Sequence, residues 1–228
     1  MNKKFFLIVV FFIFLNFENN VFAHVSHYKT LKKLEFDLYR NIKLIGTHVY
    51  TFNRKENLLN VHSIINFEIK KLGVTLYKYF AEGNEEYIDG KFNSFSAKTK
   101  QNKKDKFCDI YLKEDVFFIN GSSYKGKAPE NFIIGTWWNH EIVEYEAQIS
   151  AVSGRIIEQN VEFLGKEQLV INNKRYNALK FNFTSSDASL SKDKKLNTTV
   201  WYDEESLLWI KASFEKTGFW EYRLKNIF

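Results

Sequence analysis

Apolar and polar residues alternate along much of this chain. In Leu34–Leu38 the apolar side chains fall on one face and the acids on the other, and Ile42–Phe52 and residues 61–69 continue the pattern. Because successive side chains of a strand point to opposite faces, this period of two predicts half-buried β-strands. Gly46, inside the second run, predicts a bulge or a sharp bend of the sheet.

The same pattern recurs to the end of the chain and predicts further strands over Val74–Phe80, Phe92–Thr99, Phe107–Lys113, Val116–Asn120, Arg155–Leu164, Glu167–Ile171, Tyr176–Thr184, Thr198–Asp203, Leu207–Glu215 and Phe219–Leu224. Turns are expected at Gly83-Asn84 and Asn172-Asn173, and a polar loop over Lys100–Lys106. The spacing in Thr136–Ile149 is ambiguous and allows a short helix. We therefore expect an all-β, mainly antiparallel fold: a curved meander sheet forming a half-barrel or barrel, with at most one or two short helices.

The first residues have the pattern of a signal peptide. Lys3 and Lys4 precede the apolar run Phe5–Leu15, and Val21-Phe22-Ala23 supplies a small-residue cleavage site. The run is shorter than the ~20 residues that a spanning helix needs. We expect residues 1–23 to be removed and residues 24–228 to form a single β-rich domain. No cysteine follows the run, so the domain is expected to be periplasmic in a Gram-negative host, without a lipid anchor, and secreted elsewhere.

The composition and the missing motifs exclude several kinds of functional site. The chain has 23 Phe, 12 Tyr and 5 Trp but a single cysteine, which excludes an internal disulfide framework. Cys108 shares strand parity with Ile110 and Leu112, so we expect a buried, inert thiol. No nucleophile elbow, phosphate-binding loop or zinc-protease motif is present. We accordingly expect no catalytic residue, no metal site, no cofactor and no enzymatic activity.

Clusters of acidic and of basic residues suggest two other functions, glycan hydrolysis and membrane contact. Glu85-Glu86 and Asp203-Glu204-Glu205 resemble the carboxylate pairs of glycan hydrolases, but solvated acids in turns are the favoured interpretation. The lysines of Lys98–Lys106 suggest peripheral contact with a membrane surface, although the net charge of +6 is modest. Binding of nucleic acid is not expected for an exported chain.

The aromatic residues are the candidate ligand-binding groups. Adjacent tryptophans on a strand face opposite ways, so either Trp137 or Trp138 should lie outside the core unless a ligand or partner covers it. Trp201 and Tyr202 occupy a C-terminal strand and complete the candidate set. Trp201, Trp209 and Trp220 are expected mostly in the core.

Several short segments resemble, in this order, an uncharacterised family of exported Gram-negative bacterial proteins known only as a domain of unknown function. These segments are Leu44–His48, Asn84–Phe92 leading to Thr99, Thr136–Asn139, Trp201–Asp203 and Gly218–Leu224. Tyr87 stands where that family more often has tryptophan. The resemblance implies no catalytic residues. A more distant resemblance, to the periplasmic lipoprotein-carrier and receptor half-barrels, implies a curved sheet that holds acyl chains.

Together these observations suggest an exported, non-enzymatic protein that binds an apolar ligand, such as a lipid acyl chain, on a concave sheet face. An alternative is an envelope scaffold that contacts a protein partner through Trp137 or Trp138. A glycan hydrolase is the third and least favoured hypothesis.

Overall fold

The computed structural model describes residues 28–192 and 194–228, so the expected signal peptide lies outside the described residues. The strands are β1 (Lys33–Arg40), β2 (Lys43–Lys55), β3 (Leu58–Lys71), β4 (Val74–Ile88), β5 (Lys91–Gln101), β6 (Lys104–Lys113), β7 (Val116–Gly121), β8 (Lys125–Pro129), β9 (Ile133–Ile134), β10 (Ala147–Ile149), β11 (Ile156–Ile171), β12 (Lys174–Ser185), β13 (Asn197–Asp203), β14 (Trp209–Glu215) and β15 (Phe219–Ile227). One 3-10 helix, η2 (His140–Glu144), follows β9.

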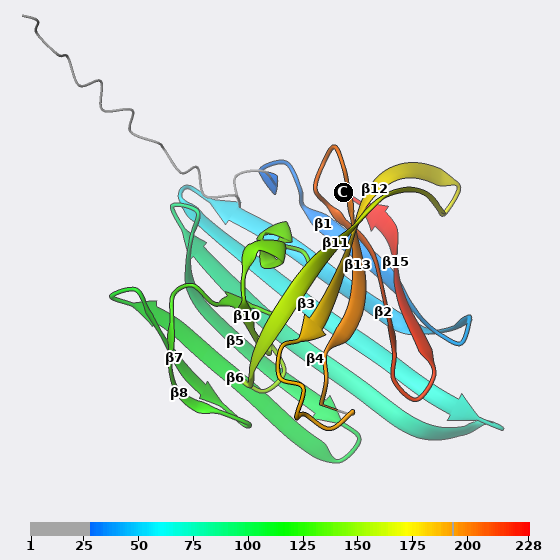
Figure 1. Cartoon of the computed structure of the whole chain (residues 1–228), viewed down its shortest axis with the longest axis horizontal. Helices are drawn as coiled ribbons and strands as arrows, with labels where there is room; N and C mark the ends of the chain where they lie inside the picture. The colour runs from blue at the N-terminus through cyan, green and yellow to red at the C-terminus, as the bar shows by residue number, and fades with distance from the viewer. Residues whose placement is uncertain (1–27, 193) are drawn as a thin grey trace, which may run out of the picture.

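All these strands belong to one sheet in the order β8-β7-β6-β5-β4-β3-β2-β1-β15-β14-β13-β12-β11-β10-β9 (Figure 1). Neighbouring strands are antiparallel, except that β9 and β10 are parallel. The first and last long strands, β1 and β15, pair in the middle of the sheet. The predicted fold class, a curved and mainly antiparallel meander sheet with at most short helices, is confirmed.

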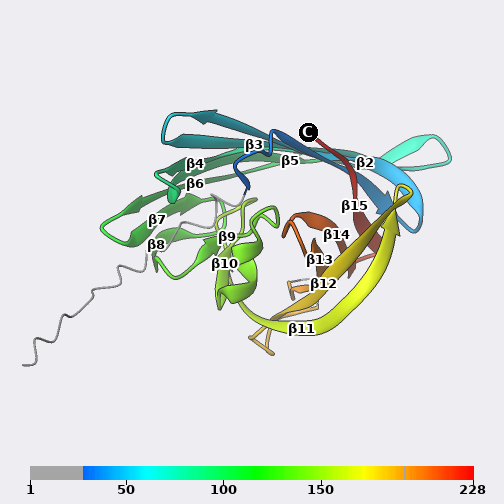
Figure 2. The same ribbon diagram turned by 90° about the horizontal axis from the view of Figure 1, so that it is seen from above.

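The sheet curls without closing into a barrel. In Figure 2 the strands β2 to β8 form a broad layer, and β11 to β13 curve round to face it. Residues 130–155, here named the inner segment, carry β9, η2 and β10 and lie between these two arms. The concave face is therefore covered in part by the chain's own inner segment.

Two groups of buried side chains hold the inner segment against the sheet. Trp138 and Ile142 belong to the larger group, together with the inward side chains of β1, β2 and β12–β15. Ile134 and Ile149 belong to a smaller group over β5–β7 that includes Phe95 and Cys108. Cys108 is fully buried, as predicted, and burial raises the pKa of its thiol to about 12.

Several strands are longer than the pattern predicted. The predicted turn at Gly83-Asn84 is wrong: β4 continues to Ile88, and the chain turns at Asp89 and Gly90, which have positive φ. The strands predicted on either side of Gly165 form one strand, because Gly165 takes a φ of +101° and absorbs a bulge. The predicted Lys100–Lys106 loop is a β-hairpin in which Lys100, Lys103 and Lys104 are exposed and Lys106 is partly buried.

Gly46 lies at the irregularity that the sequence predicted. The pairing of β1 with β2 shifts register beside it, and an added Cβ at Gly46 would lie 2.1 Å from the Asn66 carbonyl oxygen. Only glycine permits this close approach of two strands.

Candidate functional site

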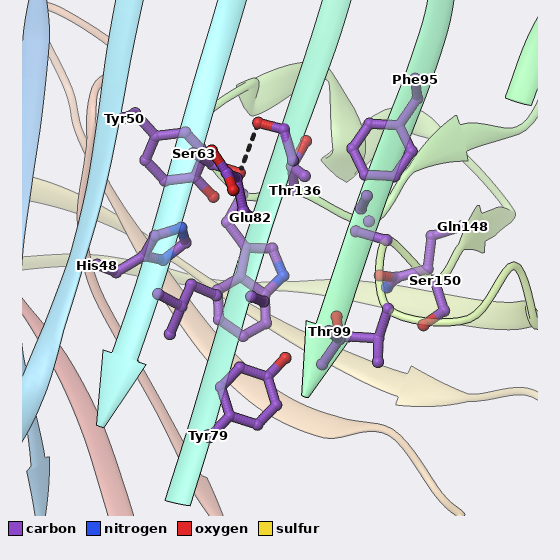
Figure 3. A pocket seen from close by; sticks show the side chains of 18 of the residues that line it. His48, Tyr50, Ser63, Tyr79, Glu82, Phe95, Thr99, Thr136, Gln148 and Ser150 are labelled. Atoms are coloured by element: carbon purple, nitrogen blue, oxygen red, sulfur yellow. Dashed lines mark hydrogen bonds between the residues drawn. The ribbon is translucent and has the colours of Figure 1, made fainter. Parts of the chain in front are cut away.

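A cavity of about 220 Å³ lies between the concave face of β2–β5 and the inner segment. Figure 3 shows His48, Tyr79 and Thr99 on the sheet side, with Gln148 and Ser150 on the opposite side. Much of the remaining wall is apolar: Ile65, Ala81, Phe95, Ala97, Ala151, Val152 and Ile157. The cavity therefore combines a mainly apolar surface with a few polar groups, as small-molecule sites do.

Three side chains of this wall have buried polar atoms without a hydrogen-bond partner. They are Nδ1 of His48, Oγ1 of Thr99 and Nε1 of Trp137. A buried polar atom that makes no hydrogen bond costs roughly 1–3 kcal/mol, and such atoms are rare in folded proteins. A polar group of a ligand in the cavity would give such atoms a hydrogen-bond partner.

His48 is held neutral by its surroundings. It is 5 % exposed and lies among aromatic rings, with the Tyr50 ring centroid at 4.3 Å and those of Tyr222 and Trp209 at about 6 Å. Burial lowers the pKa of the imidazole to about 3. At neutral pH His48 is therefore an uncharged group that donates a hydrogen bond from one ring nitrogen and accepts one at the other.

The cavity offers no cation to an anionic ligand. No Lys or Arg lines it within the described ranges. Glu82 contributes backbone, because its carboxylate is 2.8 Å from Nε2 of His62 on the exposed face of β3 and β4. The electrostatic character of the cavity therefore favours a neutral polar group.

A larger groove of about 640 Å³ adjoins the cavity and shares Tyr79, Val152 and Tyr222 with it. Its floor is aromatic: the Phe67 and Tyr79 rings stack with centroids 4.9 Å apart, and Trp220 meets Phe67 edge-on at 5.3 Å. The remaining lining residues are Arg40, Ile69, Leu76, Tyr77, Phe214, Lys216 and Thr217. The groove thus extends the cavity along the concave face toward the turn that follows β14.

Trp138 fixes the inner segment above the cavity. Its side chain is fully buried, and its Nε1 donates to the Glu85 carboxylate at 2.9 Å. The Tyr87 hydroxyl donates to the second oxygen of Glu85 at 2.9 Å, and the Thr136 side chain bonds the same carboxylate. Burial nevertheless raises the pKa of Glu85 to about 7.

The four predicted ligand-binding residues have different positions. Trp137 lines the cavity, and the Tyr202 hydroxyl supports it by donating to the Trp137 carbonyl at 3.1 Å. Trp138 contacts Glu85 instead of the cavity. Trp201 lies on the opposite face of β13 from Tyr202, beneath Lys180 and Lys211 and bonded to Glu167.

Trp137 and Trp138 do not lie on a strand, so the predicted reason for their separation is wrong, but one of the two does lie outside the core: Trp138 is fully buried and Trp137 is half-buried in the cavity wall. They occupy the turn before η2, where Asn139 caps the helix by accepting from the Glu141 N–H at 3.1 Å. Sequence reasoning missed His48, although its parity with the inward Tyr50 was a usable signal.

Glu85 and Glu86 do not form a carboxylate pair of the kind that hydrolases use. Glu85 and Glu86 lie within β4, not in a turn as predicted, and adjacent strand residues point to opposite faces. Glu86 accepts a hydrogen bond from Asn93, away from Glu85. Asp203 has the predicted turn role, because its carboxylate accepts hydrogen bonds from the backbone and hydroxyl of Ser206.

Within residues 28–192 and 194–228, no group of three or more His, Cys, Asp or Glu is arranged to hold a metal ion. No helix of the described chain has the length and apolar character needed to cross a bilayer.

Comparisons with known proteins agree with this fold. The model of a family described as a domain of unknown function, DUF6134, matches residues 36–225. A β-barrel-like protein of the domain of unknown function DUF1849 from Brucella abortus superposes with a TM-score of 0.55 at 10 % identity, covering 87 % of this chain and 98 % of that one. The likeness shows the fold alone.

A putative exported protein with a YmcC-like fold from Bacteroides fragilis aligns with a TM-score of 0.38 at 11 % identity, over 86 % of this chain and 94 % of that one. No curated protein sequence matches this chain significantly.

Proposed function

This chain belongs to the DUF6134 family, and from the cavity and groove of its concave face we propose that it is a non-enzymatic carrier or receptor of one neutral amphipathic ligand, such as an esterified lipid acyl chain. We further propose that residues 1–23 direct the chain out of the cytoplasm and that it works in the periplasm. The observation that carries the proposal is the set of three unpartnered polar atoms, His48 Nδ1, Thr99 Oγ1 and Trp137 Nε1, in the wall of a mainly apolar cavity.

The cavity and the groove suit two different parts of such a ligand. The cavity exceeds the ~150 Å³ of an apolar cavity that holds benzene, so it accommodates a compact polar end group. The groove, floored by Phe67, Tyr79 and Trp220, provides the apolar contact that a hydrocarbon chain needs. An ester or carbonyl oxygen in the cavity would accept from Trp137, and the chain would lie in the groove.

The scaffold alternative has less support. Trp138 is fully buried and Trp137 lines the cavity, so a protein partner could contact neither indole fully without displacement of the inner segment. The covered position of both indoles favours binding of a small ligand over docking of a protein at these residues.

Filling the cavity tests the proposal directly. Ala81 faces the cavity from β4, and Ala81→Phe would occupy the space of the end group. We expect at least a tenfold weaker affinity for methyl laurate, measured by displacement of a fluorescent fatty-acid probe, with unchanged or increased thermal stability. Asn84→Phe adds the same ring on the exposed face of β4 and should leave affinity unchanged. Equal affinities of the two variants would contradict the proposal, as would the absence of any lipid in native mass spectra of protein from its own host.

The charge of the ligand provides a second test. Because His48 is neutral and the described wall holds no cation, methyl laurate should bind at least tenfold more tightly than laurate at pH 7.5. Trp137→Phe, which removes the N–H donor and part of the ring from the cavity wall, should weaken binding of the ester about fivefold. Both are measured by the same displacement assay. Tighter binding of laurate would place the end group elsewhere, beside Arg40 and Lys216 of the groove.

A further inference from the structure

Three hairpin turns at one end of the sheet present large apolar side chains to solvent. Ile42 is 85 % exposed in the β1–β2 turn, Leu72 is 95 % exposed in the β3–β4 turn, and Phe219 is 41 % exposed where β15 begins. The turns are neighbours, because Arg40 pairs with Trp220 and Gly46 pairs with Phe67 (Figure 1). Residues 40–44, 70–76 and 216–219 are here named the hairpin rim.

Ile42 and Leu72 occupy unfavourable backbone positions. Their φ angles are +64° and +50°, in the left-handed region that suits glycine and asparagine and that is rare for β-branched or bulky side chains. Neither side chain packs into the core, and both expose apolar surface to water. These two side chains therefore bury no apolar surface on folding, and their exposure points to contact with an apolar partner.

The groove ends at the hairpin rim. Arg40, Leu76 and Lys216 belong to both the rim and the groove lining. A partner that covers the rim would therefore lie directly at the end of the proposed ligand site.

Basic residues flank the exposed apolar side chains. Lys43 begins β2 and Lys71 ends β3. Both are exposed and take part in no salt bridge among the described residues. Glu68, the acid nearest along β3, is engaged by Lys70 at 2.9 Å and by Lys78 at 3.3 Å. Exposed aliphatic side chains flanked by lysines suit a lipid bilayer, which has an apolar interior and can carry anionic head groups.

We propose that the hairpin rim docks on a bilayer that contains anionic phospholipid. Ile42 and Leu72 insert between the lipid chains, and Lys43 and Lys71 contact the phosphates. The groove then opens onto the bilayer, so that a lipid chain passes between membrane and protein without crossing water. This inference deepens the proposed function, on which it rests only for the identity of the ligand.

Vesicle flotation tests the docking. Purified wild-type protein should float with mixed phosphatidylcholine and phosphatidylglycerol vesicles and much less with phosphatidylcholine alone. Ile42→Asn combined with Leu72→Asn removes the apolar side chains and places a residue that tolerates positive φ. We expect this double variant to melt at or above the wild-type temperature and to lose about a hundredfold in vesicle partitioning.

Matched variants separate charge from apolar contact. Lys43→Gln with Lys71→Gln should weaken binding to the anionic vesicles by about thirtyfold and reduce its salt dependence. Val170→Thr alters another exposed apolar residue, 68 % exposed near the β11–β12 turn, and should float as the wild type does. Wild-type flotation of the Ile42→Asn/Leu72→Asn variant would overturn the inference.

Two further measurements distinguish the possible failures. Without vesicles, the Ile42→Asn/Leu72→Asn variant should bind methyl laurate with wild-type affinity, whereas Ala81→Phe should lose the ligand and still float. If Ala81→Phe binds normally while the rim variant loses flotation, the ligand proposal fails and the docking inference stands. Light scattering that shows a dimer lost in the rim variant, with no flotation of the wild type, would assign the rim to a second copy and overturn the inference.

Discussion

Replacement of Trp138 by alanine is expected to lower the free energy of unfolding by about 3–5 kcal/mol. The indole is fully buried against Tyr28, Phe52 and Tyr87, with ring centroids 5.2–5.8 Å away. Its removal opens a large void and takes from the Glu85 carboxylate the N–H donor at 2.9 Å. Urea unfolding followed by tryptophan fluorescence measures the loss.

Trp138→Phe separates packing from hydrogen bonding. It retains most of the apolar contact but leaves Glu85 without the indole donor, so we expect a smaller loss, about 1–3 kcal/mol. Hydrogen exchange should increase most in residues 135–150 in both variants, because Trp138 connects the inner segment to β4. A loss below about 1 kcal/mol for Trp138→Ala would show that other contacts anchor this segment.

Two buried titratable groups are expected to have opposite effects on stability as pH changes. Burial raises the pKa of Glu85 from 4.5 to about 7, so its contribution to stability falls as pH rises between these values. Burial lowers the pKa of His48 from 6.5 to about 3, so its contribution falls as pH decreases between these values. At about 1.4 kcal/mol per pH unit, the extremes amount to about 3 kcal/mol for Glu85 and about 5 kcal/mol for His48.

The pH dependence of stability due to Glu85 and that due to His48 cancel between about pH 4.5 and 6.5. Variants that remove one group at a time should therefore reveal the other. Relative to wild type, Glu85→Gln, which can still accept from Trp138, should gain stability as pH rises through this range. His48→Phe should lose stability relative to wild type over the same range. Urea unfolding from pH 4 to 8 provides the comparison, in which the other ionisable groups cancel. Parallel curves for wild type and Glu85→Gln would show that Glu85 is not protonated by folding.

The strand pattern could be predicted from sequence because it depends on local alternation, which β2, β3 and β14 display clearly. The prediction of strand ends was wrong where a glycine or a pair of acids was interpreted as a turn, as at Gly83 and Glu85-Glu86. Extending β4 by the same period past Gly83 would have placed Glu85 on the face of Tyr79 and Tyr87, and so inside the protein.

The cavity was beyond reach of local pattern. His48 and Trp137 meet only because the inner segment folds back over the concave face, and no periodicity in either segment specifies that return. Aromatic content directed attention to Trp137, which lines the cavity. It did not distinguish an indole that faces a cavity from one, Trp201, that lies beneath lysines on the outer face.

The pairing of β1 with β15 in the middle of the sheet has a kinetic consequence. The central ladder joins the earliest and the latest strands, so the two halves of the sheet cannot unite until synthesis has supplied the final residues. Contacts between such distant parts of a chain make folding slow, because the loop entropy is lost before the contacts compensate for it. In a polypeptide with this topology the central β1–β15 ladder therefore stays unpaired until translation ends.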